Sequence, residues 1–75
     1  MVQEDLLKQV YRFIAAYIDE NGYAPSVREI AAGCYVGLST AIRTLDILEA
    51  RGEIRRVPYQ ARSIVLVEKT ESGRK

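Results

Sequence analysis

Arginine is the residue type in this 75-residue sequence most suited to bind a ligand, because eight of its eleven cationic residues are arginines. A guanidinium group donates paired hydrogen bonds to a phosphate or to the edge of a guanine, whereas lysine acts as a point charge. Residues 51–62 hold four arginines against one glutamate, a balance of +3, while residues 1–25 carry −2. This distribution favours an anionic partner, although a solvated basic face explains the charge equally well.

Composition excludes several other kinds of chemistry. The sequence has no histidine and a single cysteine, Cys34, so an internal disulfide, a His/Cys zinc site and a histidine base are all excluded. The ten acidic residues are scattered along the chain. We therefore expect a protein that is not an enzyme and has no metal, cofactor or small-molecule substrate. Cys34 is expected to be a small buried hydrophobic residue and not a redox sensor.

The length predicts one domain over residues 1–67, followed by a disordered polar tail over residues 68–75. Apolar residues make up 48% of the chain, which suits a folded globule. We find no apolar run of about 18 residues, and Gln3, Glu4 and Asp5 do not suit a signal peptide. These features predict a cytoplasmic protein without a membrane partner.

Two helices are predicted in the first half of the chain. Apolar residues at spacings of three and four predict a helix from about Gln3 to Asn21, which Gly22 can end in the left-handed conformation. Ser26 and Glu29 have the spacing of a capping box, so a second, short helix should begin at Val27.

A third helix is predicted over roughly Leu38–Arg51, closed by Gly52. Its predicted buried stripe consists of Ala41, Leu45 and Leu48. Two β-branched segments, 54–57 and 63–67, should then pair as an antiparallel hairpin around a loop at 58–62. This order predicts a mostly α fold with a small β-hairpin, the winged helix-turn-helix, in which Ala31 allows close packing of the second helix on the third.

Two blocks, NGYAPSVREIA at 21–31 and LEARGEIRR at 48–56, together with Pro58, Arg62 and Ile64, resemble the amino-terminal DNA-binding domain of LexA-type repressors. The resemblance covers about residues 5–67, and the first block is the more specific. It implies a bacterial or phage-type transcription repressor with its third helix in the major groove and its wing on the DNA backbone. Full-length repressors of this type also carry a serine–lysine self-cleaving domain, of which these 75 residues hold no part.

The resemblance implies that the third helix contacts bases or nearby phosphates. The matching positions are Ser39, Thr40, Ile42 and Arg43. Arg43 is the best candidate for a bidentate contact to guanine, and Ile42 could press on a thymine methyl group. The alternatives are a solvated Arg43 and a buried Ile42.

Further candidates lie at the second helix and on the wing. Arg28, at a helix start, could contact a phosphate, and Ser26 is there either as a phosphate ligand or, more simply, as a cap. The wing candidates are Arg55, Arg56, Tyr59, Gln60 and Arg62. Alternation places Arg55 and Arg56 on opposite faces, and Tyr59, Gln60 and Arg62 could probe the minor groove or the backbone. The alternative is an ordinary exposed hairpin.

Two positions depart from the family's pattern. Tyr35 stands where the turn between the second and third helices usually has glycine, and the turn is one residue shorter. Gly37-Leu38 replaces a polar pair, so the third helix should have a weak amino-terminal cap.

Together these features predict sequence-selective binding of double-stranded DNA, possibly by a homodimer on a two-fold symmetric operator. The alternative is a winged-helix module for protein–protein interaction, favoured by the near-neutral charge of +1 and by apolar Leu38 and Ile42 on the presumed DNA face.

Overall fold

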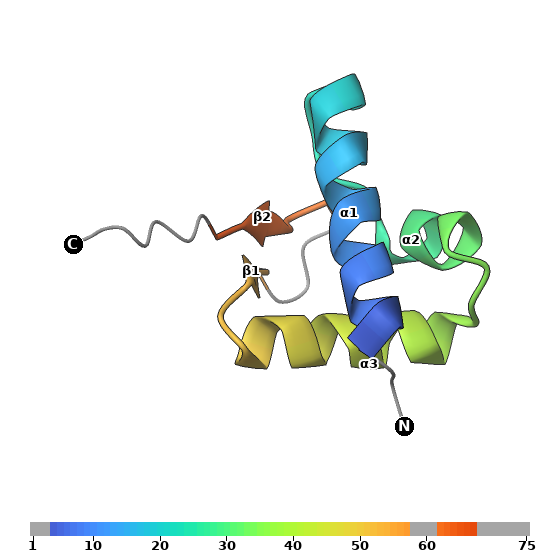
Figure 1. Cartoon of the computed structure of the whole chain (residues 1–75). Coiled ribbons are helices and arrows are strands. Elements are labelled where there is room, and N and C mark those ends of the chain that lie inside the picture. Colours follow the sequence, from blue (N-terminus) through green and yellow to red (C-terminus); the bar gives the residue numbers. More distant parts are fainter. Residues whose placement is uncertain (1–3, 58–61, 68–75) are drawn as a thin grey trace.

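The computed structural model describes residues 4–57 and 62–67. The described elements are α1 (Glu4–Asn21), α2 (Val27–Gly33), α3 (Leu38–Ala50), β1 (Ile54–Arg55) and β2 (Val65–Leu66). The two strands form an antiparallel pair that lies beside the helices (Figure 1). The winged helix-turn-helix is therefore confirmed. The predicted disordered tail at 68–75 lies outside the described residues, and the extent of the domain over 1–67 stays a prediction.

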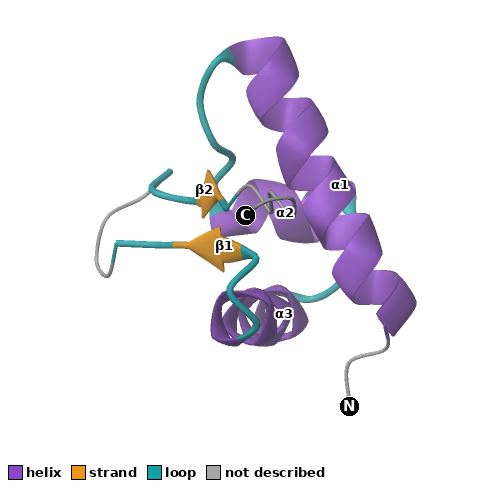
Figure 2. Ribbon diagram, turned by 60° about the vertical axis from the view of Figure 1, so that its left-hand side comes forward, coloured by secondary structure: helices purple, strands orange, loops and turns teal. Residues whose placement is uncertain are grey.

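The core lies where the three helices meet the base of the wing (Figure 2). Each helix contributes one apolar face, as its spacing predicted. The central buried residues are Leu7, Val10, Ile14, Ile30, Ala41, Leu45, Leu48, Ile54 and Ile64. Cys34 is also buried, as expected, and burial raises the pKa of its thiol. Each large buried aliphatic side chain contributes about 1.5–3 kcal/mol, so this cluster fixes how the helices are placed.

The predicted capping box is present at the start of α2. The Glu29 amide donates to the Ser26 hydroxyl oxygen at 3.2 Å, and the Ser26 amide donates to a Glu29 carboxylate oxygen at 2.8 Å. The predicted weak cap on α3 is also confirmed, because Gly37 offers no side-chain hydrogen bond there. Gly22 ends α1 with a φ of 80°, as predicted.

The strands are shorter than the predicted segments 54–57 and 63–67. Ile54 pairs with Leu66 and Arg55 with Val65. Beyond Arg55, the Ser63 hydroxyl takes the place of a backbone ladder: the Val57 amide donates to it at 3.0 Å, and it donates to the Val57 carbonyl at 3.1 Å. Of the predicted wing loop at 58–62, residues 58–61 lie outside the described residues.

Within the described part of the chain, no helix is long and apolar enough to cross a membrane.

The turn between α2 and α3 is a Schellman motif closed by a tyrosine. The Val36 amide donates to the Ala31 carbonyl at 3.0 Å and the Tyr35 amide to the Ala32 carbonyl at 3.3 Å. This motif needs a left-handed residue, and Tyr35 adopts a φ of 58°. The end of α3 repeats the motif with Gly52, whose φ is 78°. A tyrosine thus occupies a conformation that suits glycine.

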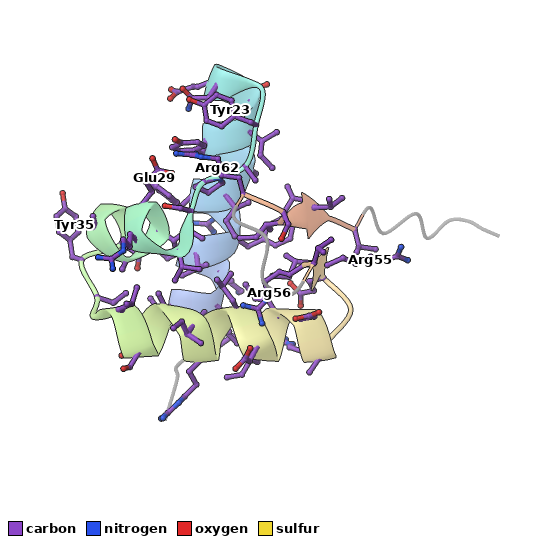
Figure 3. All side chains as sticks on the ribbon, turned by 180° about the vertical axis from the view of Figure 1, so that it is seen from behind. Tyr23, Glu29, Tyr35, Arg55, Arg56 and Arg62 are labelled. Atoms are coloured by element: carbon purple, nitrogen blue, oxygen red, sulfur yellow. The ribbon has the colours of Figure 1, made fainter. Side chains whose placement is uncertain are left out.

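We expect Tyr35→Gly to raise the thermal midpoint by a few degrees. The left-handed conformation costs a side-chain-bearing residue about 1–2 kcal/mol, and the added freedom of glycine in the unfolded chain offsets about 0.4–1 kcal/mol. The Tyr35 side chain points into solvent and is 92% exposed, so little packing is lost (Figure 3). Circular dichroism melts measure the shift, with Gly52→Tyr as the reciprocal variant that should lower the midpoint. An unchanged or lower midpoint for Tyr35→Gly contradicts this account of the turn.

Candidate DNA-binding surface

The buried stripe of α3 decides which of its residues face outward. Ala41, Thr44, Leu45 and Leu48 are buried. The residues on the opposite side, Ser39, Arg43, Asp46 and Ala50, are exposed. At about 100° per residue, these four form one outward stripe. Ser39 and Arg43, predicted to contact bases or phosphates, are thus exposed on the outer face of α3.

The other two predicted residues of α3 lie at the margins of this outward stripe. Ile42 is 42% exposed, so the interpretation that it is buried is wrong. Thr40 is half-buried, and its carbonyl accepts a hydrogen bond from the Thr44 hydroxyl at 2.8 Å. Within the described residues, Arg43 forms no ion pair.

A groove of about 680 Å³ runs between α3, the start of α2 and the wing. Figure 2 shows α3 end-on beneath the wing strands that overhang this region. The α3 side of the groove is lined by Leu38, Ile42, Asp46 and Glu49. The facing side includes Pro25, Val27, Arg56, Val57 and Ile64. The groove is thus apolar at the amino-terminal end of α3 and charged toward the other end.

The predicted residues at the start of α2 have separate roles. The Ser26 hydroxyl caps the helix, as its simpler interpretation held. Arg28 is exposed, lines the groove beside α3, and is therefore placed to reach a ligand held on α3.

Arg55 and Arg56 point to opposite sides, as alternation predicted. Arg55 projects into solvent away from the helices, whereas Arg56 lies over α3 (Figure 3). The Arg56 guanidinium pairs with the carboxylates of Asp46 and Glu49 on α3. Of these two arginines, only Arg55 is open to an external anion.

Arg62 anchors the wing to the helices. Its guanidinium donates to the two carboxylate oxygens of Glu29 at 3.0 and 3.1 Å and to the Ala24 carbonyl at 3.1 Å. It also donates to the Tyr17 hydroxyl at 3.3 Å and lies 5.0 Å from the centre of the Tyr23 ring. Figure 3 shows Arg62 between Glu29 and Tyr23. The prediction that Arg62 is a DNA probe near the wing tip does not fit these contacts.

The same network acts on Glu29. Hydrogen bonds from the Ser26 amide and then from Arg62 lower the pKa of the Glu29 carboxyl to about 2. The hydrogen bonds that Arg62 donates to Glu29 also raise the pKa of Arg62, so the pair stays ionised.

The basic character predicted for residues 51–62 is therefore mostly neutralised within the described structure. Arg51 pairs with Glu4 and Glu53, and Arg56 and Arg62 have the acidic partners given above. The structure leaves Arg28, Arg43 and Arg55 exposed on α2, α3 and the wing. Tyr59 and Gln60, the remaining predicted wing residues, lie outside the described residues.

Sequence reasoning missed the acidic partners. Asp46 and Glu49 lie three residues apart on α3, and this spacing could have indicated a shared face that needs a cation. No local pattern pointed to Tyr17 and Tyr23 as partners of Arg62, because these contacts span 45 and 39 residues of sequence.

Comparison with known proteins fits this geometry. A family profile described as the LexA DNA-binding domain matches residues 5–63. This chain belongs to the LexA DNA-binding domain family. It is 39% identical over 67 residues to LexA repressor 1 of Geobacter sulfurreducens, covering 88% of this chain and 33% of that protein. It is 44% identical over 66 residues to the LexA repressor of Clostridium kluyveri, covering 84% of this chain and 32% of that protein.

The LexA repressor of Clostridium acetobutylicum is 40% identical over 76 aligned positions, which cover 97% of this chain and 36% of that protein. This LexA-family chain therefore spans about a third of the length of the relatives it matches. The resemblance found in the two sequence blocks is confirmed over nearly all of the described domain.

Proposed function

We propose that this chain binds double-stranded DNA sequence-selectively, as the operator-binding domain of a LexA-like transcriptional repressor. The observation that carries the proposal is the outer face of α3, where Ser39, Ile42 and Arg43 are exposed on a helix fixed by its buried stripe. A helix held this way can enter the major groove with its amino-terminal turns against the bases. The domain acts by binding and has no catalytic step, and access to genomic DNA implies a cytoplasmic location.

The first two turns of α3 contact the bases. Arg43 donates to the O6 and N7 atoms of a guanine, because its guanidinium lies on the outward stripe, has no ion pair among the described residues and matches that bidentate edge. Ile42, exposed beside it with Leu38, packs against thymine methyl groups. Ser39 and Thr40 contact bases or phosphates at the end of the helix that enters the groove.

Contacts to the DNA backbone come from residues around α3. Arg28 on α2 and Arg55 on the wing are exposed, and each supplies a phosphate contact. Tyr59 and Gln60 of the wing loop supply further backbone or minor-groove contacts. Such contacts fix the register of α3 and make the affinity dependent on salt.

Two copies of the domain bind the two half-sites of a symmetric operator. One helix-turn-helix unit contacts few base pairs, and a two-fold arrangement doubles the contacts. A single domain should therefore bind weakly.

A protein-interaction role is the second candidate, because Leu38, Ile42 and Val57 are exposed along one groove. An ion pair between Arg43 and an acid would make this arginine unavailable to DNA and would favour that role. Arg43 has no such partner among the described residues. In a DNA complex, the apolar residues of α3, Leu38 and Ile42, would also contact thymine methyl groups. We therefore favour DNA as the ligand.

Fluorescence anisotropy tests the proposal. A duplex selected from a random library and a scrambled duplex of the same composition are titrated at roughly 50 and 200 mM salt. We expect tighter binding to the selected duplex and, if three phosphates are contacted, a loss of about 40-fold over this salt range. Equal, salt-insensitive binding to the two duplexes contradicts specific DNA readout and favours the protein-interaction role.

A further inference from the structure

The DNA-facing side of α3 carries two acidic residues, which phosphates should repel. Asp46 lies on the outward stripe with Arg43, and Glu49 lines the groove with Ile42. Their side chains are 61% and 42% exposed. Both lie in the carboxyl-terminal half of α3, where the helix carries partial negative charge.

Arg56 covers both carboxylates from the wing. Its Nε donates to Glu49 Oε1 at 3.0 Å, its Nη2 lies 3.0 Å from the same oxygen, and Nη2 also donates to the Asp46 carboxylate. The Arg56 side chain is only 22% exposed, so the acids and the base of the wing enclose it. Figure 3 shows it between the wing and α3.

We propose that Arg56 is a positioning residue that neutralises Asp46 and Glu49, so that α3 can approach DNA, and is not itself a phosphate contact. This inference rests on the proposed function. Two of its nitrogens are engaged with α3, and moving the guanidinium to a phosphate would leave two carboxylates facing the DNA. The same bonds join the start of the wing to α3.

The proposed role of Arg56 affects the affinity for DNA more than the stability of the fold. Ion pairs whose acids are open to solvent, as those of Asp46 and Glu49 are, add little to the stability of a fold, whereas like charges placed against each other at an interface strongly oppose binding. Removing Arg56 should therefore leave the thermal midpoint nearly unchanged and weaken binding to the selected duplex by roughly tenfold.

The experiment is a thermodynamic cycle with four proteins: the natural sequence, Arg56→Ala, Asp46→Asn/Glu49→Gln, and the triple variant. Dissociation constants are measured by anisotropy on the selected duplex, at a temperature where circular dichroism shows all four folded. We expect Arg56→Ala to cost roughly tenfold with the acids present and less than about threefold once they are neutral. Arg56→Gln, which keeps most of the aliphatic stem, replaces the alanine variant if that variant is unfolded.

Arg55→Ala is the matched control, because Arg55 is the neighbouring arginine and is exposed away from the acids. Arg55→Ala should weaken binding by the same factor whether Asp46 and Glu49 are acidic or replaced by neutral residues. If Arg56→Ala costs as much or more with neutral partners as with acidic ones, Arg56 contacts DNA directly and the inference is overturned. If the natural sequence binds no duplex, the proposed function fails and this inference fails with it, which is a different result from an uncoupled cycle.

Discussion

Replacing Arg43 with alanine is expected to weaken binding to the selected operator by about 5- to 150-fold and to abolish the preference for guanine at one position of each half-site. The side chain lies on the outward stripe of α3 without an acidic partner among the described residues, so its donors are available to a base. A bidentate arginine–guanine contact is worth about 1–3 kcal/mol of discrimination, which gives this range. Anisotropy against operators carrying each of the four base pairs at the affected position measures both effects.

Arg12→Ala serves as the control for charge. Arg12 is exposed on α1 and lines a small depression beside Arg51, away from the groove between α3 and the wing. Arg12→Ala removes one positive charge, as Arg43→Ala does, and should change the affinity for the operator less than about twofold. If Arg43→Ala weakens binding equally to the operator and to the scrambled duplex, Arg43 is a phosphate contact and does not read a base.

Replacing Gly33 with valine is expected to lower the stability of the domain by about 2 kcal/mol, or roughly 8–16 °C in thermal midpoint. A Cβ atom at Gly33 would lie 2.2 Å from Cε1 and 2.5 Å from Cζ of the Phe13 ring on α1. The side chain must therefore push α2 from α1 or displace a packed ring. The small gain in helix propensity over glycine, well under 1 kcal/mol, does not offset this.

Phe13→Leu provides the background that identifies the cause. The shorter side chain removes the ring atoms that a Cβ at Gly33 would meet, so Gly33→Val should cost much less stability there. Thermal melts of the four proteins measure the coupling. An equal cost in both backgrounds rules out the Phe13 contact as the reason for glycine at this position.

The close approach at Gly33 also bears on the site, because α2 fixes α3. Ala31 was predicted to be the small residue of the helix contacts, and it is indeed buried. The close approach of Gly33 to the Phe13 ring was not predicted from the sequence. A steric requirement between α1 and α2 has no signature in local sequence, since it depends on which face of α1 meets the end of α2.

The amino-acid sequence was enough to predict the helices and how they end, but not the limits of the strands. The capping box at Ser26, the left-handed ends at Gly22 and Gly52 and the positive φ of Tyr35 all depend on hydrogen bonds between residues up to five positions apart. Apolar periodicity then fixed the buried stripe of α3, and with it the exposure of Ser39 and Arg43. These features could be predicted because their causes are local.

Which arginines remain available to a ligand depends on how the chain folds in three dimensions. Arg62 meets Glu29 across 33 residues of sequence, and Arg56 meets Asp46 across ten, after the hairpin folds back over α3. Their types and positions suggested DNA contacts, as did those of Arg43, Arg28 and Arg55. An ion pair forms wherever the folded backbone brings opposite charges within a few ångströms, and one-dimensional spacing does not contain that distance.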